Sequence, residues 1–254
     1  MSNMATPTIS QLPSDIKRRL RRKGDFFLCP DDIVCPKVAY IGENVYYRFM
    51  NFVYLPQPPD SLSIEKVVEL CDLRLDLMGK LVNTDINKHI VAQAANVVKA
   101  HSAKPLSGLR VLDFGCGSGF SSLLLKEELP GIRITGVDIS KKAVKHARKA
   151  GLTVERTYPD KALPFDNASF DYIFAIFVMH FNVGVSTLEE LKRILHPSGK
   201  FVFNVYRRDV EGVLEQLDEV GFHIDEVMSV EGANGTTTNH VIVSCASFTP
   251  DFVS

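Results

Sequence analysis

The feature that most restricts the fold is the stretch VLDFGCGSGF at residues 111–120. A short apolar segment typical of a buried strand runs into a turn with alternating glycines at Gly115, Gly117 and Gly119, and a helix-like segment follows. A strand, a glycine turn and a helix in this order begin a βαβ unit, and such units build parallel sheets. The glycines also allow the backbone to approach a ligand at the end of the strand.

From about residue 84 onward, strand-like and helix-like segments alternate. We expect strands at residues 110–115, 133–139, 153–158, 170–179, 200–207, 223–231 and 239–247. The pair Asn234-Gly235 is a strong signal for a tight turn between the last two strands. The pattern predicts an α/β fold: a seven-stranded, mostly parallel, doubly wound sheet with an antiparallel C-terminal hairpin.

Residues 1–83 differ in texture, because aromatic residues and prolines replace the regular alternation. We expect a helix from Ser14 to about Gly24, and otherwise a helical and irregular extension that covers the substrate of a second domain at 84–254. Aromatic side chains crowd between positions 46 and 54. They are interpreted as a lid, and the alternative is an ordinary core of the extension; the residues expected to contact substrate there are Tyr46, Tyr47, Phe49 and Tyr54.

Composition excludes several classes of protein. The chain has 254 residues and a formal net charge of -1, and this balance argues against a general nucleic-acid binder. The only sequence feature in favour of nucleic-acid binding is the basic run at 17–23. Its 5 cysteines are irregularly spaced, which indicates reduced thiols and a cytoplasmic location. Cys29 and Cys35 lack a second ligand pair at zinc spacing, so we expect no metal site. The N-terminal segment has no apolar signal core, and no apolar run is long enough to span a membrane.

The spacing of the glycine turn indicates its ligand. In a dinucleotide-binding G-x-G-x-x-G turn the third glycine would stand where Phe120 is, and no Gly-Lys-Ser/Thr ending marks a P-loop. Asp113 precedes the turn, and a carboxylate there suits an ammonium group better than a pyrophosphate. Asp138 ends the next strand, where an acid accepts hydrogen bonds from ribose hydroxyls. Adenosine, ribose and a charged amino-acid tail together describe S-adenosylmethionine.

Four segments with recognisable motifs follow one another along the chain: VLDFGCGSG, VDIS, ALPFDNASFDYIFAIFVMHF and LEELKRILHPSGKFVF. Over about residues 84–246 the sequence resembles the class I S-adenosylmethionine-dependent methyltransferases of small-molecule type. The resemblance implies S-adenosyl-L-methionine as cofactor and S-adenosyl-L-homocysteine as product. It implies Asp113 at the methionyl end, Asp138 on the ribose, Ile139 and Asp160 at the adenine, and Ala175 and Ile176 beside the methyl group. The implied cofactor-binding set is Asp113, Gly115, Cys116, Gly117, Asp138, Ile139, Asp160, Ala175 and Ile176.

Two of these positions carry alternatives. Asp160 stands one residue nearer the following leucine than in many relatives, so it is equally interpreted as a loop acid. Cys116 is interpreted as a small space-filling residue rather than a nucleophile.

The acceptor is less well specified than the donor. His180 follows the fourth strand and is the candidate general base, with packing at the strand end as the favoured alternative. Asn182 and Tyr206 complete the expected acceptor rim. We expect methyl transfer to oxygen, nitrogen or carbon of a small organic molecule, aromatic or a specialised metabolite. RNA or protein methylation, or cofactor binding without transfer, are the alternatives; the oligomeric state and the pathway stay open.

Overall fold

The structure is a computed structural model that describes residues 9–30, 34–49, 52–77, 84–159, 161–206, 209–231 and 237–247. It divides into two compact units, Met1–Ser63 and Ile64–Ser254. The division precedes α2 (Ile64–Leu77), because this helix contacts α5 (Lys141–Lys149) in the second unit. The functional boundary expected at residue 83 stays a prediction. Among the described residues, no helix is both long and apolar enough to cross a membrane.

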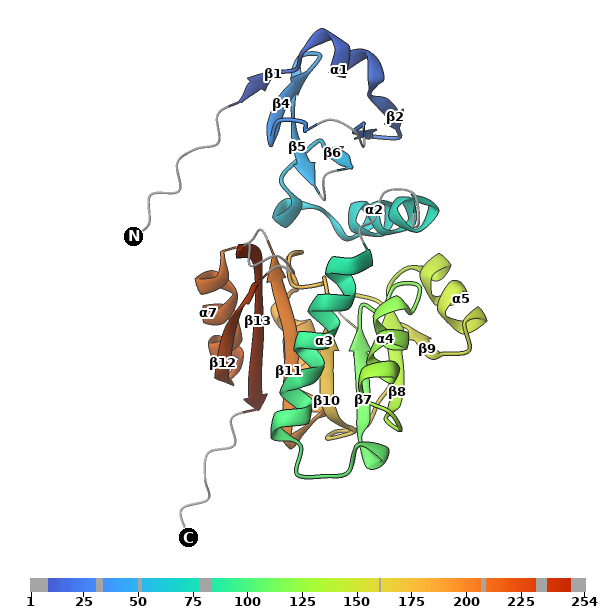
Figure 1. The fold of residues 1–254 in the computed structure, drawn as a ribbon, viewed down its shortest axis with the longest axis vertical. Helices are drawn as coiled ribbons and strands as arrows, with labels where there is room; N and C mark the ends of the chain where they lie inside the picture. Colours follow the sequence, from blue (N-terminus) through green and yellow to red (C-terminus); the bar gives the residue numbers. More distant parts are fainter. Residues whose placement is uncertain are drawn as a thin grey trace. The chain divides into compact units, whose positions relative to one another are not determined.

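The second unit is built on a seven-stranded sheet with the order β12-β13-β11-β10-β7-β8-β9 (Figure 1). Its strands are β7 (Arg110–Phe114), β8 (Arg133–Asp138), β9 (Thr153–Arg156), β10 (Phe170–Ala175), β11 (Leu195–Tyr206), β12 (Phe222–Glu231) and β13 (Thr237–Ser247). The neighbouring strands β9, β8, β7, β10 and β11 run parallel to one another. Strand β13 pairs antiparallel with β11 and with β12, and β12 and β13 form the hairpin. The predicted sheet is confirmed; Asn234 and Gly235 of its turn lie outside the described residues.

Helices cover both faces of this sheet. On one face lie α3 (Thr84–His101) and α4 (Phe120–Glu128), which Figure 1 shows side by side across the strands. On the other lie α6 (Val185–Ile194) and α7 (Val210–Val220). The alternation along β7 explains the division, since Val111 joins the core under α3 and Leu112 joins the core under α6 and α7. Burying each such side chain contributes about 1.5–3 kcal/mol.

The direction of chain progression reverses between β7 and β10, because β7 leads to β8 on one side and β10 to β11 on the other. In open α/β sheets the crevice outside the carboxyl ends of the strands at such a reversal is where ligands bind. The fold therefore directs attention to the turns that follow β7, β8 and β10.

The first unit contains a six-stranded sheet with the order β1-β4-β5-β6-β3-β2. Its elements are β1 (Ser10–Gln11), α1 (Ser14–Arg19), β2 (Arg21–Lys23), β3 (Phe26–Leu28), β4 (Val38–Ile41), β5 (Asn44–Phe49), β6 (Val53–Leu55) and the single-turn helix η1 (Pro59–Ser61). The expected helical and irregular extension is thus wrong in secondary structure. The helix ends at Arg19, and residues 21–23 form a strand paired with β3.

The physical reason lies in the aromatic stretch. Aromatic and β-branched side chains fit a half-buried pleated surface, and here they form β5 and β6, which pair antiparallel. Gly42 supplies the positive φ of +66° that the two-residue turn between β4 and β5 needs. Each of these strands is only 2 to 6 residues long, so none has enough residues to show a period in the sequence.

Candidate active site

Neighbouring strands bring the implied cofactor residues to one edge of the sheet. Asp113 of β7 pairs with Gly136 of β8 on one side and with Phe174 of β10 on the other. The next residues along the three strands are therefore the glycine turn, Asp138, and the end of β10. The two acids, the turn and Ala175 thus meet at the reversal point of the strand order.

Asp138 is held by backbone groups on both carboxylate oxygens. The Gly117 N–H donates to Oδ2 at 2.8 Å, and the Ser140 N–H donates to Oδ1 at 2.7 Å. Burial raises the pKa of Asp138, while the hydrogen bonds from Ser140 and Gly117 act to lower it. Each carboxylate oxygen accepts one of these bonds and has capacity for another, so two hydroxyl groups of a ligand could donate to it.

Asp113 is almost completely enclosed, with an exposed fraction of 1%. The Ser122 hydroxyl of α4 donates to its Oδ2. Burial raises the pKa of Asp113 to about 7, and the nearby charge of Asp138 adds to this shift, while the Ser122 bond opposes it. In the part of the chain that the structure describes, neither acid forms an ion pair with a lysine, arginine or histidine.

The glycines of the turn have different surroundings. Gly115 has φ +71°, and a Cβ there would lie 2.5 Å from Cγ2 of Val178, so the turn is closed on that side. Gly117 has φ +57°, and a Cβ there would meet nothing within 4 Å. The backbone at Gly117 therefore faces open space beside the Asp138 carboxylate, which leaves room for a ligand to approach.

The side chain of Cys116 points into the protein rather than toward this space. It is buried with Val144, Ala147, Leu152 and Val154, and a Cβ on Gly136 would lie 2.7 Å from its sulfur. Burial raises the pKa of its thiol well above the ordinary value, so a thiolate is disfavoured. Its backbone N–H, like that of Gly115, donates to the Val137 carbonyl. Cys116 shapes the turn, in line with the space-filling interpretation.

The end of β10 is shaped by an unusual backbone. The strand ends at Ala175 and not at residue 179 as expected, because Phe177 adopts φ +59° and turns the chain. The side-chain oxygen of the buried Asn204 accepts the Phe177 N–H at 2.7 Å and holds this turn. Left-handed backbone at a non-glycine residue costs about 1–2 kcal/mol, so the surrounding contacts maintain it. Ala175 and Ile176 are buried beside it.

His180 lies just beyond this turn and is buried, with an exposed fraction of 3%. Its ring lies against that of Phe181, with centroids 4.1 Å apart. This contact supports the packing interpretation, and the role of general base stays a prediction. Asn182 is exposed, and Tyr206 is half-buried at the end of β11.

A contact that the sequence analysis missed joins α2 to the Asp138 loop. The Ser140 hydroxyl donates to Asp72 of α2 and accepts the Ala143 N–H, so it also caps α5. Lys142 forms an ion pair with Asp76 one turn further along α2. These contacts fix the segment that carries Asp138. Ser140 was recognisable as an N-cap before KKAV, and Asn204 as a polar residue in a buried strand, whereas nothing in the sequence pointed to Asp72.

The aromatic residues expected to contact substrate belong to the first unit. Phe49 and Tyr54 are buried within it, and the Tyr54 hydroxyl donates to the Pro36 carbonyl at 2.8 Å. Tyr46 and Tyr47 are half-buried, and Tyr46 packs edge-on against Phe27. These contacts favour the alternative of an ordinary core, and a substrate role stays a prediction. Asp160 lies outside the described residues.

Together, these features define the ligand that the site suits. A carboxylate ready to accept two hydroxyl donors, a second acid without a cationic partner, and an open glycine between them fit a nucleoside joined to a positively charged group. They do not suit a pyrophosphate, because both acids would repel it. Within the described ranges, no three His, Cys, Asp or Glu side chains are grouped so as to hold a metal ion.

Comparisons with known proteins agree with this description. Residues 112–203 match a family described as a methyltransferase domain. The chain is 33% identical over 118 residues to a malonyl-[acyl-carrier protein] O-methyltransferase of Erwinia pyrifoliae, covering 45% of this chain and 43% of that protein. It is 30% identical over 135 residues to a demethylmenaquinone methyltransferase of Thermus thermophilus, covering 51% and 59%. The chain thus spans about half the length of the curated relatives it matches.

A solved structure, a SAM-dependent methyltransferase of Aquifex aeolicus, shares the fold with a TM-score of 0.50 and 22% identity, over 74% of this chain and 100% of that one. The matched family covers the turn after β7, Asp138, β10 and most of β11. S-adenosylmethionine is the cofactor of this class. Residues 112–203 therefore belong to a methyltransferase domain, and the second unit has the Rossmann-like fold of the class I S-adenosylmethionine-dependent methyltransferases.

Proposed function

We propose that this protein transfers a methyl group from S-adenosylmethionine to oxygen, nitrogen or carbon of a small organic acceptor. The observation that carries the proposal is the open backbone at Gly117 between two buried acids that have no cationic partner among the described residues. When bound, S-adenosylmethionine supplies a methyl group already activated by its positive sulfur. The protein then has to align the acceptor, exclude water and, for some acceptors, remove a proton.

The residues at the sheet edge divide the binding work. Asp138 would accept hydrogen bonds from the two ribose hydroxyls, and its backbone partners would keep the carboxylate in place. Asp113 would face the positively charged methionyl end, directly or through water. Ile139 would flank the adenine, while Ala175 and Ile176 would form an apolar wall next to the methyl group. Asp160 remains our candidate for the adenine amino group.

His180 is the candidate proton acceptor for an acceptor hydroxyl or amine. If it has this role, His180→Gln should lower kcat strongly, leave cofactor affinity unchanged, and remove the lower limb of the pH profile of kcat/KM. Phe181→Leu keeps the imidazole but removes the ring that packs against it, so it shows how much of a loss comes from disturbed packing alone. Unchanged turnover of the folded His180→Gln protein would instead assign His180 to packing.

The names of the relatives favour a small or carrier-bound organic acceptor, since they include enzymes for malonyl-acyl-carrier protein and demethylmenaquinone. The test is incubation of the protein with methyl-labelled S-adenosylmethionine and a metabolite extract, with mass spectrometry of the products. We expect label in a small molecule and none with the Asp138→Ala variant. Label confined to RNA or protein would favour a macromolecular acceptor. Tight cofactor binding without any labelled product would contradict the proposed transfer.

A further inference from the structure

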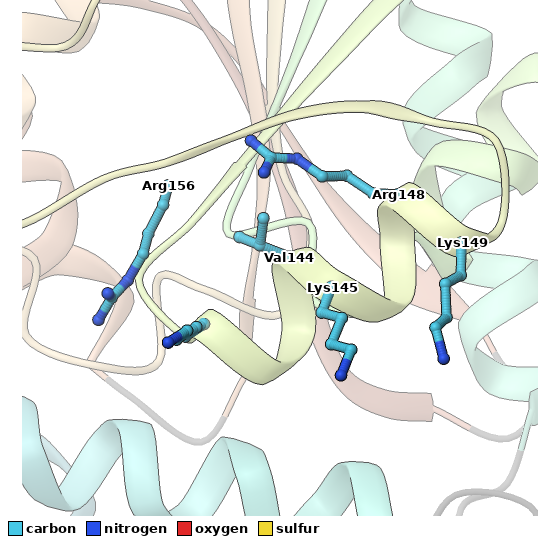
Figure 2. A pocket seen from close by; sticks show the side chains of 6 residues that line it. Val144, Lys145, Arg148, Lys149 and Arg156 are labelled. Atoms are coloured by element: carbon cyan, nitrogen blue, oxygen red, sulfur yellow. The ribbon is translucent and has the colours of Figure 1, made fainter.

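A basic groove lies along α5, on the helix that follows the Asp138 loop. Its volume is about 580 Å³, and it is lined by Lys141, Val144, Lys145, Arg148, Lys149 and Arg156 (Figure 2). We call this feature the α5 groove. Lys141 is three residues from Asp138, yet none of the six residues belongs to the implied cofactor set. The groove therefore has its own lining, although Arg156 joins it to the cofactor set through a hydrogen bond to the Ile139 carbonyl.

Positive charge is concentrated in the α5 groove. Five of its six residues are cationic. Among the described residues, the acid that forms an ion pair with one of these five is Glu155, which lies 3.3 Å from Arg148. Five cations and one carboxylate leave four positive charges, in a chain whose formal net charge is -1. A hollow lined by one sign of charge attracts ligands of the other sign.

The two arginines are held in place by the protein itself. The Arg148 Nε donates to the Val154 carbonyl at 2.8 Å, and the Arg156 Nε donates to the Ile139 carbonyl at 3.2 Å. Arg156 also lies over the ring of Tyr158, 4.7 Å from its centroid. A guanidinium fixed through Nε keeps terminal N–H groups for a ligand and loses less entropy when it binds.

Size decides what kind of ligand fits. Small-molecule sites measure about 300–1,000 Å³, whereas a stable protein interface uses roughly 20–30 residues on each side. A groove lined by six residues belongs to the first class. Val144 and the aliphatic stems of the lysines provide an apolar floor on which the body of a small ligand could lie.

The arrangement of charges indicates how many anionic groups the ligand carries. Figure 2 shows that the charged ends of Lys145, Arg148, Lys149 and Arg156 do not meet at a single point. One phosphate could not contact all of them, and two phosphates would offset the four excess charges. We propose that the α5 groove is a binding site for a small ligand with two or more phosphate groups, in addition to the cofactor site.

The test is calorimetric titration of the full chain with inorganic tripolyphosphate at low and physiological salt. We expect saturable binding that weakens at least tenfold in Arg148→Gln/Arg156→Gln and in Lys145→Gln/Lys149→Gln. The second pair leaves both arginine–carbonyl bonds intact, so it separates loss of charge from loss of local structure. Lys88→Gln/Lys126→Gln removes the same charge from exposed positions on α3 and α4 and should bind like the wild type.

Equal affinity in all variants would overturn the proposal, since binding would then be diffuse attraction. Tighter binding of a single-stranded RNA oligomer than of tripolyphosphate through the same residues would overturn it in favour of a nucleic-acid surface. A measurement of S-adenosylmethionine binding by Lys145→Gln/Lys149→Gln shows whether that variant is folded, and thermal unfolding serves for Arg148→Gln/Arg156→Gln, because Arg156 donates to the carbonyl of Ile139 in the implied cofactor set.

Discussion

Buried acids at the two edges of the seven-stranded sheet, where its parallel strands begin and where they end, have opposite electrostatic surroundings. At the amino end of β10, the carboxylate of Asp171 accepts hydrogen bonds from Lys104 at 2.8 Å and from the Arg110 backbone N–H at 2.9 Å, with the Arg110 guanidinium nearby. Although burial acts to raise it, these bonds hold the pKa of Asp171 well below its usual range. At the carboxyl ends of β7 and β8, Asp113 and Asp138 have raised pKa values and no cationic partner among the described residues.

The difference separates a structural acid from acids kept for a ligand. Asp171 is neutralised within the chain, so its charge stabilises the fold. Asp113 and Asp138 are buried at a cost in stability that a bound cation or hydroxyl pair would offset. Perturbed acids in a crevice are characteristic of functional sites, and here they lie at the end of the sheet where ligands bind in this architecture.

We expect the largest effect on stability when the ion pairs of Asp171 are removed. Asp171→Asn is expected to lower the free energy of unfolding by about 3 kcal/mol, because charged hydrogen bonds from two cations are lost, and to leave cofactor affinity unchanged. Denaturant titration measures the loss. Glu128→Gln, which breaks a pair with Lys99 that is over one third exposed on both sides, is the control and should cost less than about 1 kcal/mol. If both variants lose the same free energy of unfolding, Asp171 has no special structural role.

The same substitution at the other end should affect binding instead. Asp138→Asn is expected to weaken S-adenosylmethionine binding about 100-fold, or about 2.7 kcal/mol, while stability changes little, because relief of a buried charge offsets the lost backbone bond. Calorimetry measures the affinity, with the exposed Asp166→Asn as control. An affinity within threefold of wild type would refute the ribose assignment.

Two glycines with positive φ, Gly117 in the second unit and Gly42 in the first, allow a similar comparison of binding with stability. Gly117→Ala and Gly42→Ala both place a side chain at positive φ with nothing within 4 Å, so each should cost about 1–2 kcal/mol of stability. Only Gly117→Ala should also weaken cofactor binding, by more than tenfold, because its methyl group would occupy the ligand's space. If both variants bind S-adenosylmethionine like the wild type, the open space at Gly117 is not part of the cofactor site.

The pH dependence should reveal Asp113. Its pKa in the folded protein is about 7 against an ordinary value near 3.8, so between these values the folded state binds more protons than the unfolded state. Its contribution to stability is therefore greatest at low pH and falls as the pH rises to about 7. Cofactor affinity should instead decrease as the pH falls, by less than tenfold from pH 7.5 to 6, because the ammonium group of the cofactor binds the ionised form of Asp113. In Asp113→Asn both dependences should vanish; if they persist, another group is responsible.

The smallest effect concerns the clamp from α2. Asp72→Asn keeps the shape of the side chain but removes the charge that accepts the Ser140 hydroxyl. We expect cofactor affinity to fall about threefold, or less than 1 kcal/mol, because the Gly117 and Ser140 N–H groups still hold Asp138. Ser140→Ala, which also removes the N-cap of α5, should lower stability as well. An Asp72→Asn effect as large as that of Asp138→Asn would mean that α2 contributes directly to the cofactor site.

The sequence predicted the second unit well because its key positions allow few residue types. Gly115 and Gly117 need positive φ, Asp138 must end a strand, and the sheet strands are long enough to alternate with helices. The supporting contacts were not predictable, since Asp72 and Ser140 lie 68 positions apart. Phe177 was assigned to a strand because its apolar neighbours suggest one, and only the Asn204 side chain explains the turn.

The first unit illustrates the opposite case. Its strands pair across the chain, for example Phe27 with Tyr54, and no local rule specifies such partners. Aromatic residues serve equally in a lid and in a core, so Tyr46 and Tyr54 could not be assigned from their type. The burial of Tyr54 favours a place in the core for this residue, and a substrate role for the aromatic residues stays a prediction.

The position of β13 has a consequence for how the protein is made. This strand follows β12 in the chain but inserts between β12 and β11, so β12 cannot join the sheet before β13 has been synthesised. On the ribosome, the first unit and the strands β7 to β11 can emerge while the backbone N–H and C=O groups at the edge of β11 are still unpaired. Domains generally fold in order during synthesis, and here the nascent chain needs protection of that edge until residue 247 has left the exit tunnel.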